Sequence, residues 1–383
     1  MKEYILFGII LGILSGFIPA IHSNTIISFL NEFGISEEVF PYLIISLFGA
    51  YTLCSFIPSI FFGIPDDSSV LTVLPGQRLV KEGRGPLALK TVIFCSVFTA
   101  VICLALFPVS LFAFPVIYSI LKAHMGYILI ILSIVLLIKS KKPLYALVIF
   151  LLAGMLGYSA FKLELKDPFL PLFCGMFALA AMYAYKKSKI PEQKDEKLDL
   201  GILKYAVAGI IGGFFADLIP GVSSASQVST FISIFLPITS LGYLATISSV
   251  SVSQAIFALS TSASIEKSRV GAVVWLSKFT DLSADFYLYA LLFIFSLCIA
   301  AAILYFFRMK ISSVSKVDFS KLNIVLAIYL FSLVYLIDGF IGIVIFIAGS
   351  FLGYCAIRLN VERTFLMGAV IIPTMLFFLK IFI

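Results

Sequence analysis

Two short stretches place small polar side chains next to a helix-breaking proline inside strongly apolar sequence. The first break, residues 18–25, has the sequence IPAIHSNT, and the second break, residues 219–226, has the sequence IPGVSSAS. Proline lacks the backbone N–H and clashes with the preceding turn, and glycine accepts almost any backbone conformation. Such a break leaves free N–H groups at the start of the following helix, and with nearby hydroxyls they form an anion site without a buried cation.

The expected ligands of this anion site come from both breaks. Within a membrane, irregular backbone is tolerated where it lines a cavity, and paired breaks are typical of transporter binding sites. The alternative is that the small polar residues only allow helices to pack closely. Because the breaks recur at corresponding places in the chain, we favour binding, with contacts from Ser23, Asn24, Thr25, Pro220, Gly221, Ser223, Ser224 and Ser226.

Two ionisable residues lie at the breaks, Asp217 at the end of an apolar run and His22 within the first break. Ionisable side chains in apolar spans usually face a cavity or a partner. Asp217 is expected either to bind a coupling ion or to cap the interrupted helix. His22 either titrates near neutral pH or packs as a hydrogen-bonded side chain. Both are retained as candidates for binding the coupling ion.

The most polar segment of the first half follows the second apolar span, at residues 63–72 with the sequence GIPDDSSVLT. Its carboxylates, Asp66 and Asp67, are further coupling-ion candidates, and Ser68 and Ser69 are candidates for substrate contact. Aspartate and serine are also good N-cap residues, so the segment can start a helix. The two roles are compatible.

Composition places the chain among helical membrane proteins. Of its residues, 61% are hydrophobic and only 12% are charged, and the mean hydropathy is +1.14. Soluble domains are about half apolar and a quarter charged. The sequence therefore predicts an all-α, multi-pass protein of the cell membrane, surrounded by lipid. The net charge of +7 comes from lysines and arginines in short loops, which set orientation and do not indicate nucleic-acid binding.

No pattern of catalytic or metal-binding residues is present. The six cysteines lie singly in apolar segments, where free cysteine is usually a small buried hydrophobe. The phosphate-binding loop, the G-x-S-x-G elbow and the H-E-x-x-H helix are absent. We therefore expect neither an enzyme nor a cofactor, apart from Na⁺ or H⁺ as a coupling ion.

An internal repeat divides the chain. At one constant offset the two halves match at Tyr4 and Tyr205, Gly8 and Gly209, Gly12 and Gly213, and Pro19 and Pro220. A second match joins residues 157–163 to residues 353–359. The predicted organisation is a first transmembrane repeat over 1–185, a cytoplasmic linker over 186–200 and a second transmembrane repeat over 201–383. Each repeat is expected to carry a broken or re-entrant helix near the bilayer midplane.

Basic loops indicate how the two repeats are oriented. The linker holds five lysines between residues 186 and 199, which places it on the cytoplasmic side. Lys162 lies one span before the linker, yet by the repeat it matches Arg358, which shares a side with the basic segment 308–316. This arrangement favours inverted repeats, which suit alternating access to one site from two sides.

Two local features carry further expectations. Residues 107–117 contain two prolines and are expected to form a connection or a half-helix. Lys278 and Asp281 are three positions apart on a weakly apolar helix, so a local ion pair is expected.

The polar segment of the first half also resembles a known family. GIPDDSSVLT at 63–72, followed by LVKEGRGPLAL at 79–89, is similar to the N-I-P-G-[DE]-x-S-S-x-x-T loop and the later G-[RK]-x-x-x-A-L of the TctA family. These proteins are the large membrane subunits of tripartite tricarboxylate transporters. Gly353 and Tyr354, followed by a basic residue, resemble the C-terminal part of the family. Pro65-Asp66 stands where the family has Pro-Gly.

The resemblance implies a permease for an organic anion, a carboxylate, moved by secondary active transport coupled to Na⁺ or H⁺. It also implies a small membrane subunit and an extracytoplasmic binding protein as partners. A shorter likeness, ADLIPGVSSA at 216–225, is to bacterial polyprenyl-phosphate translocases, so a lipid-carrier flippase acting on an anionic lipid is an alternative. A structural or sensory membrane protein that has lost transport is a third possibility.

Overall fold

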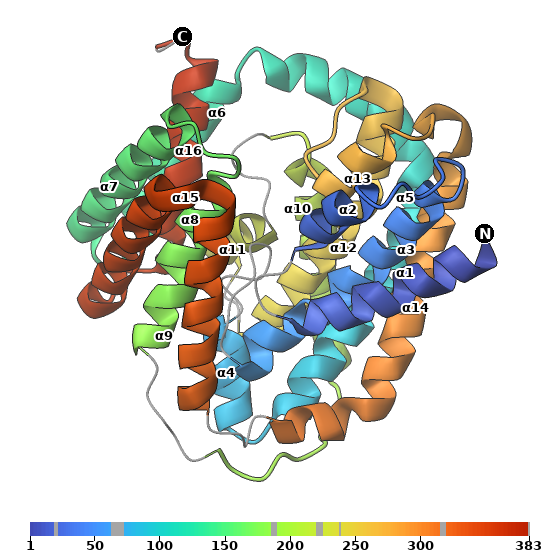
Figure 1. Cartoon of the computed structure of the whole chain (residues 1–383), viewed down its shortest axis with the longest axis horizontal. Helices are drawn as coiled ribbons and strands as arrows, with labels where there is room; N and C mark the ends of the chain where they lie inside the picture. The colour runs from blue at the N-terminus through green and yellow to red at the C-terminus, as the bar shows by residue number, and fades with distance from the viewer. Residues whose placement is uncertain are drawn as a thin grey trace. The chain divides into compact units, whose positions relative to one another are not determined.

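The computed structural model describes residues 1–18, 22–62, 73–184, 190–219, 225–236, 239–314 and 319–381. Within these ranges the regular elements are helices, and no strand occurs (Figure 1). Six helices are long and apolar enough to cross a membrane: Phe40–Phe61, Gly85–Lys122, Pro143–Lys162, Ser240–Ile265, Leu282–Ser313 and Asn323–Leu359. The predicted all-α, multi-pass membrane class is confirmed.

Contacts between helices group the chain into two compact units. Unit 1 comprises Met1–Ala123 and Ile190–Ser315, and unit 2 comprises His124–Lys189 and Lys316–Ile383. Each unit takes helices from both halves of the sequence, so the units do not follow the predicted repeats. The division into repeats at 1–185 and 201–383 stays a prediction.

The described helices of unit 1 are α1 (Lys2–Phe17), α2 (Ser23–Asn31), α3 (Phe40–Cys54), a π-helical turn η1 (Pro58–Phe62), α4 (Val73–Lys81), α5 (Gly85–Lys122), η4 (Leu200–Ile202), α10 (Leu203–Ala216), α11 (Ala225–Phe235), α12 (Ser240–Ile265), α13 (Gly271–Leu276) and α14 (Leu282–Val314). Those of unit 2 are α6 (Met125–Lys139), α7 (Pro143–Lys162), α8 (Phe169–Phe173), η3 (Cys174–Leu179), α9 (Ala180–Ala184), α15 (Phe319–Leu359), η5 (Arg363–Met367) and α16 (Gly368–Phe378).

In unit 1, close packing through glycine occurs at matching places of the sequence. A Cβ added at Gly12 of α1 would lie 2.9 Å from the Ala50 Cβ of α3. One added at Gly213 of α10 would lie 2.8 Å from the Ser253 Cβ of α12. Small residues let helix backbones approach closely enough for van der Waals contact to hold them together in lipid. The glycines that revealed the repeat therefore serve the same packing role in α1 and α10.

The long helices α5 and α14 pack together in opposite directions. Phe107 of α5 stacks on Phe286 near the start of α14, with ring centroids 5.3 Å apart. Lys90 near the start of α5 and Arg308 near the end of α14 both bind Asp195, at 2.6 and 2.7 Å. The predicted repeat pairs these two helices, and its inverted orientation stays a prediction.

In unit 2, polar contacts hold both ends of α7 against α15. Gly339, with a φ of 64°, divides α15 into two helical parts. Lys142 Nζ, just before α7, donates to the carbonyl of Leu359 at the end of α15 (2.7 Å). Beyond the other end of α7, the Asp167 N–H donates to Asp338 Oδ1 (2.9 Å). The second part of α15 therefore also runs antiparallel to α7.

The expected interruption at residues 107–117 is wrong. α5 is a continuous helix that includes Pro108 and Pro115. Phe107 and Phe114 are fully buried in a hydrophobic core, and Ser110 Oγ lies 2.7 Å from Ser260 Oγ of α12. Packing against neighbouring helices outweighs the local cost of the prolines, as it commonly does in membrane helices.

The expected Lys278–Asp281 ion pair does not form either. Lys278 Nζ lies 3.9 Å above the centroid of the Trp275 ring. Asp281 Oδ1 accepts from the backbone N–H (2.8 Å) and the hydroxyl of Ser283. The carboxylate thus caps the start of α14, where helical N–H groups lack partners, and this position outweighs the exposed ion pair.

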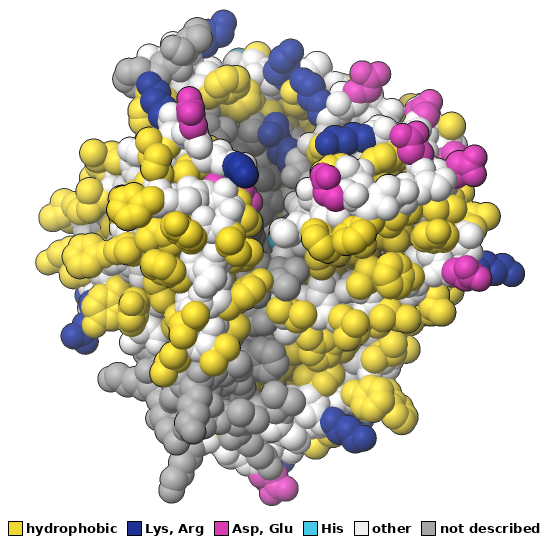
Figure 2. Space-filling view, viewed as in Figure 1, with side chains coloured by type: hydrophobic (Ala, Val, Ile, Leu, Met, Phe, Trp, Pro, Cys, Tyr) yellow, Lys and Arg dark blue, Asp and Glu magenta, His cyan; other side chains and the backbone are white. Residues whose placement is uncertain are grey.

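In both units the exposed helix faces are hydrophobic, as contact with lipid requires. Leu6, Ile10 and Leu14 lie exposed on α1, and Leu151 and Met155 lie exposed on α7. Figure 2 shows hydrophobic side chains gathered over these helices.

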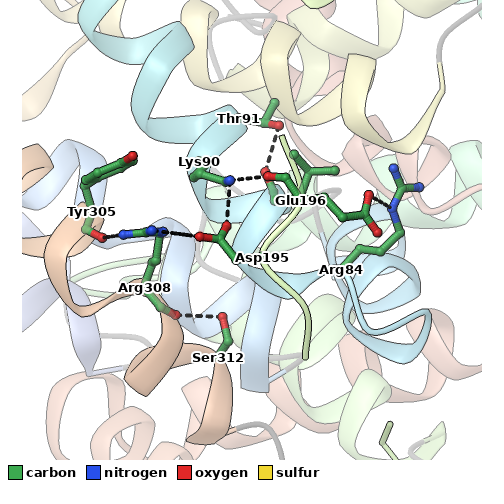
Figure 3. A network of polar contacts seen from close by, with 9 residues as sticks. Arg84, Lys90, Thr91, Asp195, Glu196, Tyr305, Arg308 and Ser312 are labelled. Atoms are coloured by element: carbon green, nitrogen blue, oxygen red, sulfur yellow. Dashed lines mark hydrogen bonds and ion pairs between the residues drawn. The ribbon is translucent and has the colours of Figure 1, made fainter. Parts of the chain in front are cut away.

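Part of the predicted linker forms an ordered strap, which we define as residues 190–199. Gln193 is buried: its Oε1 accepts from the Gly85 N–H and its Nε2 donates to the Val80 carbonyl, both at 2.9 Å. Asp195 joins Lys90 and Arg308, and Glu196 pairs with Arg84 at 3.0 Å (Figure 3). The strap therefore holds the start of α5 beside the end of α14.

The strap gives a pH-dependent prediction. Hydrogen bonds from Arg308 and then Lys90 hold the pKa of Asp195 below its usual value. When the pKa of a carboxyl in the folded state lies below its unfolded-state value of about 3.9, the ionised group stabilises the fold at any pH above that unfolded value. This stabilisation is lost as the pH falls through the folded-state pKa. Asp195→Asn should lower the Tm at pH 7. The difference in Tm from wild type should vanish towards pH 2, because a pH of about 2 lies below most lowered Asp pKa values.

Thermal unfolding in detergent, followed across this pH range, measures the effect. Glu192→Gln removes an exposed carboxylate from the same strap and is the matched control. A Tm deficit of Asp195→Asn that stays constant from pH 7 to the acid limit would show that the ion pairs contribute nothing.

Candidate functional site

The first break ends in a capped helix start. His22 Nδ1 accepts a hydrogen bond from the Asn24 N–H at 3.3 Å, and the His22 ring meets Tyr51 of α3 edge-on at 5.6 Å. The imidazole therefore has a structural role as the N-cap of α2. Its role as a proton-binding group stays a prediction.

Two polar side chains of α2 lack internal partners. Ser23 is fully buried and its Oγ has no hydrogen-bond partner among the described residues. The same holds for the buried Oδ1 of Asn24. Thr25, the third predicted ligand of this helix, is exposed. Buried polar atoms are nearly always paired, so Ser23 and Asn24 are the positions where α2 has unused hydrogen-bonding capacity.

The second break lies between two helices that fold back on each other. α10 ends at Ala216 and α11 begins at Ala225. A Cβ added at Gly212 of α10 would lie 2.7 Å from Val228 and 2.8 Å from Ile232 of α11. A helix that continued in one direction could not bring these residues together, so α10 and α11 form a helical hairpin, and its re-entrant placement in the membrane stays a prediction. Ser226 is fully buried at the start of α11.

Asp217 fixes the end of α10. Its carboxylate is 5% exposed, and Oδ2 accepts from the Thr261 hydroxyl of α12 at 2.5 Å. Oδ1 accepts from the Arg269 N–H at 2.9 Å, while Arg269 Nε donates to the Asp217 carbonyl at 3.1 Å. The carboxylate thus holds both the end of α12, through Thr261, and the polar loop that follows it, through Arg269. This is the capping alternative, extended to a second helix. Ion coupling through Asp217 stays a prediction.

The loop after α12, residues 266–270, connects the surroundings of the two breaks. Gly271, which follows this loop and starts α13, lies directly beneath the Asn24 amide, and a Cβ there would be 2.5 Å from Asn24 Cγ. Arg269, two residues earlier, makes the bonds to Asp217. One short segment of chain therefore contacts both Asn24 of the first break and Asp217 of the second.

Sequence reasoning assigned no role to Thr261, Arg269 or Gly271. Their only signal was their place in or beside the polar stretch 260–269, which closes the third apolar span of unit 1. Their contacts join positions more than forty residues apart, and no local pattern reveals such a pairing.

The remaining predicted ligands cannot be placed. Those that lie outside the described residues are Asp66, Asp67, Ser68, Ser69, Pro220, Gly221, Ser223 and Ser224. The described part of the site therefore consists of His22, Ser23, Asn24, Asp217 and Ser226 with the loop at 266–270.

Comparison with known proteins identifies the family. The tripartite tricarboxylate transporter TctA family matches residues 3–368. An uncharacterized protein of Methanocaldococcus jannaschii is 28% identical over 410 aligned positions, which cover 98% of this chain and 98% of that protein. No solved structure matches. Because the match spans nearly the whole chain, the protein belongs to the tripartite tricarboxylate transporter TctA family.

Proposed function

We propose that this protein is the permease of an organic-anion transporter, with a carboxylate as substrate and Na⁺ or H⁺ as the coupling ion. Membership of a transporter family supports transport rather than catalysis. The observation that carries the proposal is the contact of a single loop with both breaks, through Gly271 at Asn24 and Arg269 at Asp217. A solute bound there touches both halves of the chain, as alternating access requires.

The chemistry around the breaks suits a carboxylate. The Ser23 hydroxyl and the backbone N–H groups at the start of α2 are neutral donors, and a helix start favours a negative group. Arg269 adds a cation: its Nε is engaged by Asp217, and its two terminal nitrogens make no hydrogen bond to a described residue. A guanidinium in this position pairs with a carboxylate through two parallel bonds.

Membership of the family supports a proposal for the partners and the location. A tripartite transporter has further subunits, and we assign this chain the role of large membrane subunit in the cell membrane. A small membrane subunit and an extracytoplasmic binding protein that delivers the solute are the proposed partners.

The alternative substrate is a polyprenyl phosphate. Its support is the stretch at 216–225, in which Asp217 now has a defined place at the end of α10. A flippase moves labelled lipid between leaflets and ignores soluble carboxylates, so the two functions separate in one set of proteoliposomes. A protein inactive in both assays would be the structural or sensory alternative.

The binding site can be tested with two variants of α2. Asn24→Ala should weaken binding of a radiolabelled carboxylate about tenfold, because it removes the amide Nδ2 donor, and a lost hydrogen bond to a charged group costs about 1.5–3 kcal/mol. Ser28→Ala, at an exposed position of the same helix, should bind like wild type. Equilibrium binding to the purified protein, with mono-, di- and tricarboxylates, measures the effect without the partner subunits.

Ser224→Ala provides a second test at the other break. If both Asn24→Ala and Ser224→Ala bound every carboxylate as tightly as wild type, the breaks would not form the site.

Coupling is tested by imposed gradients. Inward Na⁺ or H⁺ gradients should speed uptake into proteoliposomes that also hold the partner subunits. Asp66→Asn or Asp67→Asn should abolish this acceleration and leave solute exchange without a gradient intact. Uptake that responds to neither gradient would exclude the coupling proposed here.

Asp217→Asn and His22→Gln separate capping from coupling. The asparagine amide accepts only one of the two bonds that Asp217 now accepts, so the Tm should fall. If the gradient response survives in both variants, Asp66 and Asp67 are the remaining candidates.

A further inference from the structure

An arginine in unit 2 has no counter-ion among the residues that the structure describes. Arg363 starts η5 and is partly buried, and its Nη1 is completely buried without a hydrogen-bond partner. No acidic side chain among the described residues forms an ion pair with it. The next residues of η5, Thr364–Met367, are buried, so the guanidinium lies at the edge of an apolar core.

The acid beside Arg363 in the sequence binds elsewhere. Glu362 Oε2 accepts from the Ser140 hydroxyl at 3.2 Å, and that hydroxyl also accepts from the Lys142 N–H at 3.2 Å. With the Lys142–Leu359 bond, these contacts hold the turn between α15 and η5 against the turn between α6 and α7. Glu362 therefore cannot turn to Arg363 without losing its own partner.

The surrounding charge is strongly positive. The two turns carry five basic side chains, Lys139, Lys141, Lys142, Arg358 and Arg363, against the single acid Glu362. Of these cations only Arg363 is partly buried, and the others are exposed. The end of unit 2 thus attracts anions, with one cation set below its surface.

An unpaired buried cation is costly, because removing a charge from water costs several kcal/mol unless a partner compensates it. A lysine can lose its proton in such a place, but an arginine stays charged at any ordinary pH. A bound anion would compensate the charge. A planar guanidinium matches the two oxygens of a carboxylate or phosphate group.

We propose that Arg363 is the central ligand of an oxyanion site at this end of unit 2, for the carboxylate or phosphate group of a soluble anion or of a lipid headgroup. The site shares no residue with the two breaks. It goes beyond the proposed transport function and does not depend on it.

The test compares Arg363→Gln with Arg358→Gln. Both variants remove one positive charge from the same turn, but Arg358 is exposed and lies over the Tyr354 ring. Purified protein in neutral detergent is titrated with inorganic phosphate at constant ionic strength, and is separately placed in nanodiscs of neutral or anionic lipid. Thermal unfolding is followed in each condition.

Wild type and Arg358→Gln should gain Tm with the oxyanion, and Arg363→Gln should need about tenfold more anion for the same gain, since charge-assisted bonds are about twice as strong as neutral ones. A gain with phosphate identifies a soluble ligand, and a gain only in anionic nanodiscs identifies a lipid. Asn24→Ala should keep the gain, which separates this site from the proposed transport site.

The Tm of Arg363→Gln relative to wild type, measured without added anion, is a second test. Because the unpaired charge is unfavourable there, Arg363→Gln should unfold at the same temperature as wild type or higher. A Tm several degrees below wild type would mean that the guanidinium is already satisfied within the protein, and would overturn the proposal. Equal gains in wild type and Arg363→Gln with every oxyanion and lipid would also overturn it.

Discussion

The constraint behind this structure is that a peptide group held in an apolar surrounding must have a hydrogen-bond partner. Helices meet it by themselves, so each interruption needs its own solution. At the first break the His22 imidazole accepts from the Asn24 N–H. At the second, the Asp217 carboxylate receives a hydroxyl and a backbone N–H from the end of α12 and its loop. The polar residues around the breaks are thus needed for folding before any solute binds.

Because these polar residues act in folding as well as in the proposed binding, only part of the site could be predicted from the sequence. The interruptions were visible because proline and glycine act locally, and the membrane class was visible because it depends on composition. The contacts of Asp217 with Thr261 and Arg269 were hidden because they depend on how α10 packs along α12. Where local chemistry and packing disagree, as at Pro108 and Pro115 within α5, packing decides the structure.

The repeat and the compact units describe different aspects of the chain. Helices that the predicted repeat pairs, such as α5 and α14, lie together in unit 1, while α7 and the second part of α15 lie together in unit 2. Each unit therefore contains an antiparallel pair of helices with one member from each half of the chain. The repeat itself stays a prediction, and the packing shows that helices from opposite halves are neighbours.

The strap has a mechanical consequence. Asp195 holds Lys90 and Arg308, so any motion that separates the start of α5 from the end of α14 must break at least one of these two ion pairs. These groups are partly open to water, and a surface ion pair contributes about 0–1 kcal/mol. The ion pairs of the strap are therefore weak enough to open by thermal motion. Because they are charges in contact with water, the salt concentration rather than hydrophobic burial sets how often they open.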